Sequence, residues 1–222
     1  MEEEKKAAII LGATGLTGGK LLKLLLADDR YQKVKLFSRS SVGIQHEKLE
    51  EHLGDLMNLS SFKEDFTGQE VFCCIGTTKA KTPDNALYEK IDYGIPVEAA
   101  KLCVENQIPT FVVVSALGAD AKSKIFYNRI KGQMEEAVLQ QQIRNTYILQ
   151  PSLIGGKREE KRLGEWLFKQ LMKIGNLLLV GGLRKYRSIE PDSIAQCMLW
   201  VANNDYPNGK IESDKIKELA KQ

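Results

Sequence analysis

The chain has 222 residues, of which 43% are hydrophobic and 27% charged, so it can bury a sizeable core and is not a disordered protein. The formal net charge is only +3, and this gives no indication of a nucleic-acid or anionic-membrane partner. Residues 1–6 are acidic and then basic, and no apolar run approaches the ~20 residues needed to cross a bilayer. We therefore expect no signal peptide, no membrane span and a cytoplasmic location.

Strand-like and helix-like patterns alternate along the chain, which predicts an α/β fold with a Rossmann-like, doubly wound parallel sheet and helices on both faces. The predicted strands are residues 7–11, 34–37, 49–53, 71–75, 111–114, 146–149 and 177–180. The predicted helices begin at residue 16 and cover residues 59–66, 87–106, 123–142 and 192–203, with a turn at Gly181-Gly182 and a polar tail at residues 211–222 that forms at most a short helix. Pro96 should break or kink the long helix near Gly94.

The region after Pro151 has a different character from the rest of the chain. Residues 157–162 form a charge run, and apolar residues then recur at helical spacing: Leu163, Trp166, Leu167, Leu171 and Ile174. Such a stripe is typical of a helix that faces the core, and it suits a lid over a substrate pocket equally well. We expect one domain, residues 1–222, in which residues 152–187 form a small substrate lid.

Three glycines spaced by three, Gly12, Gly15 and Gly18, stand between the first predicted strand and the first predicted helix. A helix N-terminus offers a pyrophosphate unpaired N–H groups and the positive end of the helix dipole. Glycine permits the sharp turn, the close approach to the phosphates and the packing of helix on strand, and Thr14 and Thr17 add hydroxyl donors. The strand-turn-helix context predicts a dinucleotide-binding turn, and an ordinary structural turn is the alternative.

Cysteine and histidine usage gives no indication of a metal centre. The chain has four cysteines and no C-x-x-C pair: Cys73, Cys74, Cys103 and Cys197. We expect them to be reduced core residues, with the adjacent Cys73 and Cys74 on opposite faces of a strand. His46 and His52 are the only histidines and no carboxylate cluster accompanies them, so we expect neither a metal site nor a histidine-based triad.

Tyr127 and Lys131 stand four residues apart in a predicted helix and therefore share one face of it. A lysine ammonium favours the phenolate of a nearby tyrosine, which suits that tyrosine to proton exchange with a carbonyl or an alcohol. The two other Y-x-x-x-K pairs of the chain give no clean helical face. Ser115 ends the preceding strand, where ligands bind in open α/β sheets. We therefore predict that Ser115, Tyr127 and Lys131 converge; a surface tyrosine–lysine pair is the alternative.

These motifs resemble those of the atypical short-chain dehydrogenase/reductases and, more narrowly, the Tat-interacting-protein oxidoreductase group of NADPH-binding proteins. The resemblance covers nearly the whole chain. It is carried by residues 12–18, 72–78, 115, 118–120, 127–131 and 163–167. The Cys-Cys-x-Gly-Thr-Thr and Gly-Glu-Trp-Leu stretches are its most specific parts.

The resemblance implies a role for each matching position. Tyr127 would be the general acid/base, Lys131 would hold the nicotinamide ribose and tune Tyr127, and Ser115 would orient the substrate carbonyl. Asp55 and Leu56 would lie beside the adenine, although a helix cap is the alternative for Asp55. The other cofactor-binding residues that we expect are Gly12, Thr14, Gly15, Leu16, Thr17, Gly18, Ser38, Arg39, Gly76, Thr77 and Pro151.

The second predicted strand ends in Ser38-Arg39, which bears on the choice of cofactor. An acidic residue there would bind the ribose 2′-hydroxyl of NAD, whereas an arginine suits the 2′-phosphate of NADP(H). Arg39 therefore favours NADP(H), and a plain surface arginine is the alternative. Many short-chain enzymes also carry a catalytic asparagine in the helix before the serine strand. Residues 91–94 lack it, which puts the proton relay in question.

We predict an NADP(H)-dependent oxidoreductase that reduces a small carbonyl by hydride transfer, with Tyr127 as the proton donor. An NADPH-binding sensor that acts through protein partners without significant turnover is the alternative, because fold does not fix function. A sugar-nucleotide epimerase is a weaker alternative, since the part after Pro151 is short for gripping a nucleotide sugar. The sequence does not identify the substrate, and it leaves a homodimer or a protein partner open.

Overall fold

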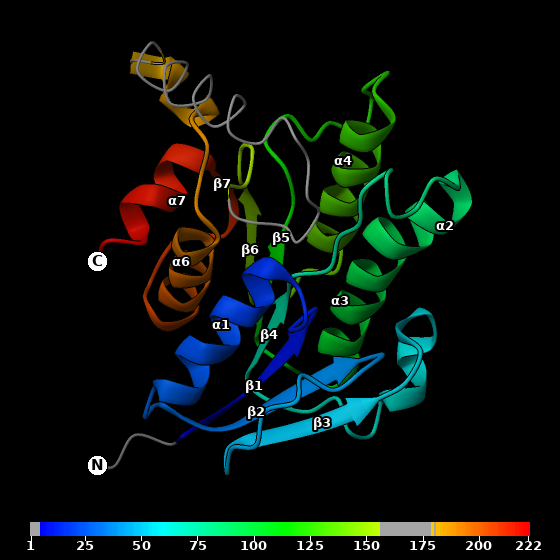
Figure 1. The fold of residues 1–222 in the computed structure, drawn as a ribbon, viewed down its shortest axis with the longest axis vertical. Coiled ribbons are helices and arrows are strands. Elements are labelled where there is room, and N and C mark those ends of the chain that lie inside the picture. The colour runs from blue at the N-terminus through cyan, green and yellow to red at the C-terminus, as the bar shows by residue number, and fades with distance from the viewer. Residues whose placement is uncertain (1–4, 156–178, 180) are drawn as a thin grey trace.

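The computed structural model describes residues 5–155, 179 and 181–222, which build a parallel seven-stranded sheet (Figure 1). The strands are β1 (Lys6–Leu11), β2 (Tyr31–Ser38), β3 (Leu49–Leu53), β4 (Glu70–Cys73), β5 (Thr110–Val114), β6 (Asn145–Gln150) and β7 (Gly209–Glu212). Their order is β3-β2-β1-β4-β5-β6-β7, and every neighbouring pair is parallel. From β1 in the centre, the chain first adds β2 and β3 on one side. It then crosses to the other side of β1 and adds β4 to β7 in order. This confirms the predicted doubly wound fold.

Helices cover both faces of this sheet. They are α1 (Leu16–Ala27), α2 (Asn85–Glu89), α3 (Ile95–Glu105), α4 (Phe126–Leu139), α6 (Pro191–Asn203) and α7 (Ser213–Leu219), with shorter 3₁₀ turns η1 (Leu56–Phe62) and η3 (Gly181–Tyr186) and a π-helical turn η2 (Lys90–Gly94). One apolar cluster joins α1, α6 and α7 to the sheet, and a second joins η1, α3 and α4 to it. Within the described residues, no helix combines the length and apolar character needed to cross a membrane.

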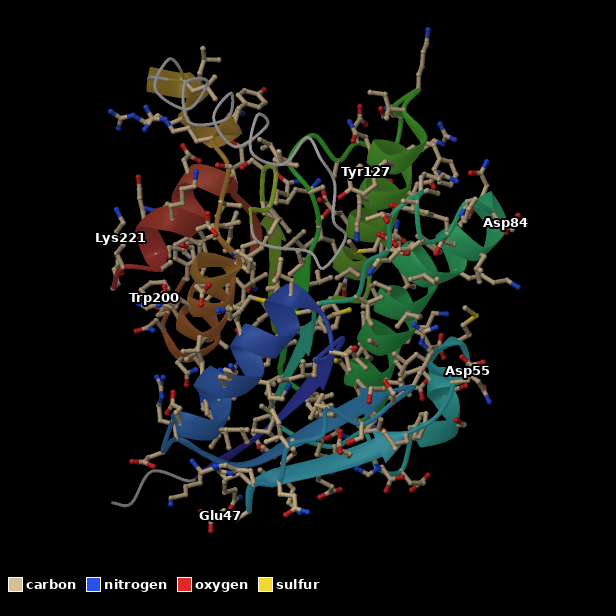
Figure 2. All side chains as sticks on the ribbon, viewed as in Figure 1. Glu47, Asp55, Asp84, Tyr127, Trp200 and Lys221 are labelled. Atoms are coloured by element: carbon tan, nitrogen blue, oxygen red, sulfur yellow. The ribbon has the colours of Figure 1, made fainter. Side chains whose placement is uncertain are left out.

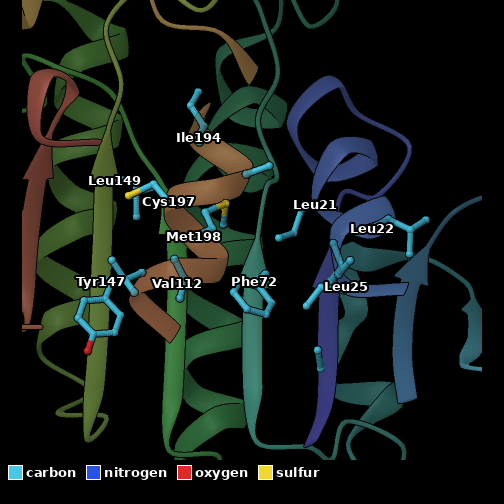
Figure 3. Close-up of a cluster of buried hydrophobic side chains, with 14 of the residues drawn as sticks. Leu21, Leu22, Leu25, Phe72, Val112, Tyr147, Leu149, Ile194, Cys197 and Met198 are labelled. Atoms are coloured by element: carbon cyan, nitrogen blue, oxygen red, sulfur yellow. The ribbon is translucent and has the colours of Figure 1, made fainter. Parts of the chain in front are cut away.

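Strand residues alternate between the two apolar clusters. Ile10 contributes to the cluster under α1 and α6, and its neighbours Ile9 and Leu11 contribute to the other. Figure 3 shows the first cluster, where Met198 of α6 lies over the strands with Phe72 and other apolar side chains. Each such buried side chain contributes about 1.5–3 kcal/mol to folding. Because both faces are covered, the central strands β1, β4 and β5 are mainly apolar, as buried parallel strands usually are.

The cysteines follow the same alternation. Cys73 belongs to the cluster of α3 and α4, whereas Cys74 packs against the cluster of α1 and α6. The predicted opposite orientation of these two neighbours is thus confirmed. Cys73, Cys103 and Cys197 are buried and Cys74 is half-buried, and all four are free thiols.

The long helix before β5 is interrupted as predicted. Pro96 has no N–H group to donate to the carbonyl of Asp92, four residues earlier. The chain forms the π-helical turn η2 at Lys90–Gly94, and α3 starts directly afterwards at Ile95. π-Turns of this kind insert one residue into a helix and change the direction of the neighbouring side chains. Here the fully buried residue of the turn is Asp92.

The C-terminal tail contains the short helix that the sequence predicts, α7, together with a strand that it does not predict. Residues 209–212 form β7, in which Ile211 pairs with Leu149 of β6, and α7 follows at once. Ile211 is the one large apolar residue of β7, so no alternating pattern marks this strand in the sequence. Pairing with β6 supplies the order that the local sequence does not specify.

Two other predictions concern the segment after Pro151. The predicted strand at residues 177–180 lies outside the described residues except for Leu179, which belongs to no strand. The helical stripe at residues 163–174 and most of the expected lid, residues 152–187, also lie outside them. Residues 181–186 form the 3₁₀ turn η3 in place of the simple turn predicted at Gly181-Gly182.

Candidate cofactor and active site

The glycine turn after β1 makes a tight connection between strand and helix. Gly12 has a φ of +88°, and a Cβ atom there would lie 3.0 Å from the carbonyl oxygen of Cys74. A Cβ atom on Gly18 would lie 2.2 Å from the carbonyl oxygen of Gly12. The Gly15 N–H donates to that same carbonyl at 3.0 Å. Side chains at Gly12 and Gly18 would therefore displace α1 from the end of β1.

The start of α1 fits the pyrophosphate of a dinucleotide. Gly15 is the N-cap and has no side chain that could accept from the N–H groups of the first turn, and that turn holds no carboxylate. These N–H groups and the positive end of the helix dipole can therefore serve an anion. Thr14 and Gly15 are exposed and Leu16 is half-buried, whereas Thr17 is buried. Thr14 is thus the more accessible of the two predicted hydroxyl donors.

The ends of β2 and β3 provide the region expected to lie beside the adenine. The Ser38 hydroxyl donates to the carbonyl of Ser40 at 2.7 Å, so it holds its own loop, and the Arg39 side chain beside it is exposed. The Asp55 carboxylate accepts from the Met57 N–H at 3.0 Å and caps η1, and Leu56 is buried. The alternative predicted for Asp55, a helix cap, is therefore present. Figure 2 shows Asp55 well separated from Tyr127.

The loop after β4 is held by Asp92. The Thr77 N–H donates to Asp92 Oδ2 at 2.8 Å, and the Thr77 hydroxyl shares a 2.8 Å hydrogen bond with Thr82. Gly76 is exposed, and a Cβ atom there would lie 3.6 Å from Asp92 Oδ1 and 3.9 Å from Lys131 Nζ. Of the two residues after β4 that are expected to line the cofactor, Gly76 thus lies next to Lys131, and Thr77 is joined to Lys131 through Asp92.

Lys131 and Asp92 form a buried ion pair. Lys131 Nζ lies 3.0 Å from Asp92 Oδ1, and the two side chains are 4% and 1% exposed. Oδ1 takes part in no directed hydrogen bond, so the contact is an ion pair only. Burial alone would lower the pKa of Lys131, but the Asp92 carboxylate, with Tyr127 adding to it, outweighs burial and raises that pKa. Lys131 is therefore a charged ammonium with an assigned counter-ion.

The Ser115 hydroxyl has a buried hydrogen-bond partner, Glu135 of α4. Its Oγ donates to Glu135 Oε1 at 2.5 Å, and Ser115 is 4% exposed. Glu135 is fully buried and also accepts from Gln150 Nε2 at 2.8 Å and forms an ion pair with Lys210 Nζ at 2.7 Å. Because a carboxylate only accepts, the single hydroxyl proton of Ser115 is committed to Glu135. Ser115 can thus accept, but in this arrangement it cannot donate to a substrate carbonyl.

Tyr127 stands one helical turn before Lys131 on α4, and 40% of it is exposed (Figure 2). Tyr88 of α2 lies in the same neighbourhood, where burial, Asp92 and Tyr127 raise its pKa. Pro151 is buried, and its carbonyl accepts from the Leu117 N–H at 2.9 Å, which ties the end of β6 to the loop after Ser115. Ser115 thus contacts α4 through Glu135, one helical turn after Lys131, and Tyr127 stands one turn before Lys131 on the same helix.

The other reactive side chains nearby do not form a further reactive centre. Burial raises the pKa of Cys73 to about 11, so its thiol is protonated at neutral pH. His52 stacks on Phe37 at a centroid distance of 4.6 Å and bonds to Glu50 at 2.8 Å. Across residues 5–155, 179 and 181–222, no group of three or more histidine, cysteine, aspartate or glutamate residues could hold a metal ion.

Sequence reasoning missed the two buried carboxylates of the site. Asp92 was part of the stretch inspected for an asparagine, and its pairing with Lys131 depends on the π-turn. Glu135 follows Lys131 by four residues, so the spacing of α4 already places it on the same helix face. Its partners come from β5, β6 and β7, which only the folded sheet brings together.

The comparisons with known proteins agree with this geometry. Residues 12–162 match the family described as NAD(P)H-binding. The chain is 35% identical over 159 residues to protein FMP52-1 of Scheffersomyces stipitis, which is named mitochondrial, covering 70% of each chain. It is 30% identical over 171 residues to protein HTATIP2 of Rattus norvegicus, covering 75% of this chain and 70% of that protein.

Solved structures give the same fold at lower sequence identity. A UDP-N-acetylglucosamine 4-epimerase from Methanobrevibacter ruminantium superposes with a TM-score of 0.70 at 16% identity, covering 97% of this chain and 81% of the epimerase. A mutated uronate dehydrogenase superposes with a TM-score of 0.66 at 10% identity, covering 94% of this chain and 74% of that enzyme. At these identities the likeness shows the fold alone.

Proposed function

Because this chain belongs to the NAD(P)H-binding family, as an atypical short-chain dehydrogenase/reductase, we propose that it is an NADP(H)-dependent oxidoreductase that reduces a small carbonyl compound. The observation that carries this proposal is that the two parts of the site lie at the same end of the sheet, where the strands have their carboxyl ends. The glycine turn of β1 and α1 lies there, and Lys131 of α4 lies beside Gly76, which follows the neighbouring strand β4. Tyr127 precedes Lys131 by one turn of α4. A cofactor bound at the first would reach the second.

Each residue of the site takes one step of this chemistry. The N–H groups at the start of α1 bind the pyrophosphate, and Lys131 holds the nicotinamide ribose. NADPH, when bound, supplies a hydride to the carbonyl carbon. Tyr127 donates the proton that the carbonyl oxygen needs. Arg39, exposed after β2, binds the 2′-phosphate, and this makes NADPH the preferred cofactor over NADH.

One observation supports a second candidate, an NADPH-binding sensor without significant turnover. The Ser115 hydroxyl donates inward to Glu135, so the group expected to orient a substrate carbonyl already has a partner. A sensor needs no such group to be available. Tight NADPH binding together with the absence of carbonyl reduction would favour this candidate.

The decisive experiment is the Tyr127→Phe variant. We expect NADPH binding, followed by nicotinamide fluorescence, to be unchanged, because the phenol oxygen is not a phosphate ligand. Turnover of probe aldehydes, ketones and quinones, followed by NADPH absorbance, should fall about 10²–10⁴-fold, since a positioned general acid contributes that much.

The matched control is Tyr206→Phe, which alters another Y-x-x-x-K pair, at the amino end of β7. It should leave both binding and turnover as in the parent. Equal turnover of the parent and Tyr127→Phe would refute the role of Tyr127. A parent protein that binds neither NADPH nor NADH would refute the oxidoreductase and the sensor together.

A further inference from the structure

The π-turn η2 directs a carboxylate into the interior beside the predicted lysine. Asp92 is 0% exposed, although it lies in a helical segment whose other residues reach the surface in part. Its Oδ2 accepts from the Thr77 N–H at 2.8 Å, and its Oδ1 lies 3.0 Å from Lys131 Nζ. A buried carboxylate is costly unless it is paired, so this geometry indicates a specific role for its charge.

The charged and titratable groups around this pair come from each neighbouring element. Tyr88 of α2 is close enough to Asp92, and Tyr127 of α4 and Cys73 of β4 are close enough to Lys131, to interact electrostatically. Among these groups within the described residues, Asp92 is the carboxylate and Lys131 the ammonium. The arrangement therefore differs from a lysine acting on a tyrosine alone, because the lysine charge already has a counter-ion.

We propose that Asp92 is a positioning residue that keeps Lys131 charged and Tyr127 protonated at neutral pH, so that the site is set to give a proton to its substrate. The physical reason is charge balance. With Asp92 ionised, the ammonium and the neutral phenol form an overall neutral group, and loss of a proton from either leaves a net negative charge in a buried place. Asp92 also joins this group to Thr77, in the loop after β4 that we expect to line the cofactor.

The consequence is a preference for the reducing direction. In that direction the carbonyl carbon gains a hydride from NADPH, which becomes NADP⁺, and the Tyr127 hydroxyl gives its proton to the carbonyl oxygen. Solvent then returns a proton to the phenolate. Alcohol oxidation needs the phenolate at the start, and Asp92 disfavours that form. This catalytic meaning rests on the proposed oxidoreductase function, whereas the effect of Asp92 on the charge of the pair does not.

The test is the Asp92→Asn variant, which keeps the shape and removes the charge. The Lys131–Tyr127 pair should lose its first proton at a pH lower by about one unit or more, whichever of the two residues releases it. The measurement is a pH titration of the tyrosine Cζ and lysine Cε carbons by NMR, with Tyr127→Phe to assign the tyrosine signal. The matched control is Glu98→Gln, which removes one half-buried carboxylate, paired with Lys101, from the adjoining helix α3.

Unchanged titration in Asp92→Asn would overturn the inference. If that variant does not fold, the NMR titration of the parent protein tests the inference instead. With Asp92 present, Tyr127 of the parent should stay protonated through pH 8. A parent Tyr127 that titrates near neutral pH would overturn the inference without any variant. If the titration shifts as expected but the parent reduces none of the probe carbonyls, the charge role of Asp92 stands and the oxidoreductase proposal fails.

Discussion

The two ends of the site are built in different ways. The proposed phosphate end consists of backbone, where a side chain on Gly12 or Gly18 would meet main-chain atoms. The proposed acid/base end consists of side chains that are held by other side chains, with Asp92 on Lys131 and Glu135 on Ser115. The part of the site made of backbone should lose binding when a side-chain atom is added to a glycine. The part made of side chains should lose its function when a charged or proton-bearing group is removed.

The largest effect should come from adding one methyl group to the backbone end. Gly18→Ala places a Cβ atom 2.2 Å from the Gly12 carbonyl oxygen, so α1 must move away from β1. We expect at least ~100-fold weaker NADPH binding and a loss of about 1–3 kcal/mol in the free energy of unfolding, as for other overpacked sites. Fluorescence titration and urea unfolding measure the two.

The control for this change is Gly182→Ala, because a Cβ atom on Gly182 would meet no atom within 4 Å. It should leave NADPH affinity and stability close to those of the parent. If Gly18→Ala bound NADPH as tightly as the parent, the phosphates would not lie on this turn.

An intermediate effect, on the free energy of unfolding, is expected when the acid/base end loses the carboxylate of Glu135. Glu135→Gln removes the ion pair with Lys210 and offers a single acceptor to Ser115 and Gln150. We expect a loss of about 1–3 kcal/mol in the free energy of unfolding in urea, because buried donors remain unsatisfied. The Lys210 side chain is 43% exposed, so water can solvate its ammonium and limit the loss.

Glu136→Gln is the matched control, since Glu136 is the next residue on α4 and is exposed. Its effect should stay within about 0.5 kcal/mol. Equal stability of the two variants would mean that the Ser115–Glu135 contact contributes nothing to the fold.

The smallest effect is expected from Arg39, on the adenine side of the proposed phosphate end. Arg39→Ala should weaken NADPH binding about 10-fold, because a charge-assisted contact with the 2′-phosphate is lost, and should leave NADH binding unchanged. Parallel fluorescence titrations measure both affinities. Arg144→Ala, an exposed arginine before β6, is the control for the change in net charge. A uniform loss with both nucleotides would count against a role in cofactor choice.

The same contrast explains what the sequence could predict. The glycine turn is local, so three spaced glycines between an apolar strand and an apolar helix sufficed to locate it. The doubly wound parallel sheet was also predictable from the alternation of strand and helix patterns. The partners of Lys131 and Ser115 are set by the π-turn at Pro96 and by the pairing of β5, β6 and β7. No local pattern encodes these contacts, and the site residues themselves remain predictions.

The position of β7 at the sheet edge has a consequence for shortened forms of the chain. If the chain ended before Gly209, β6 would become an edge strand, and the main-chain groups of β6 that now pair with β7, such as those of Ile148, would be free. Open apolar edges of this kind recruit strands from other molecules. Proteolytic removal of β7 should therefore lead to self-association through the exposed edge of β6.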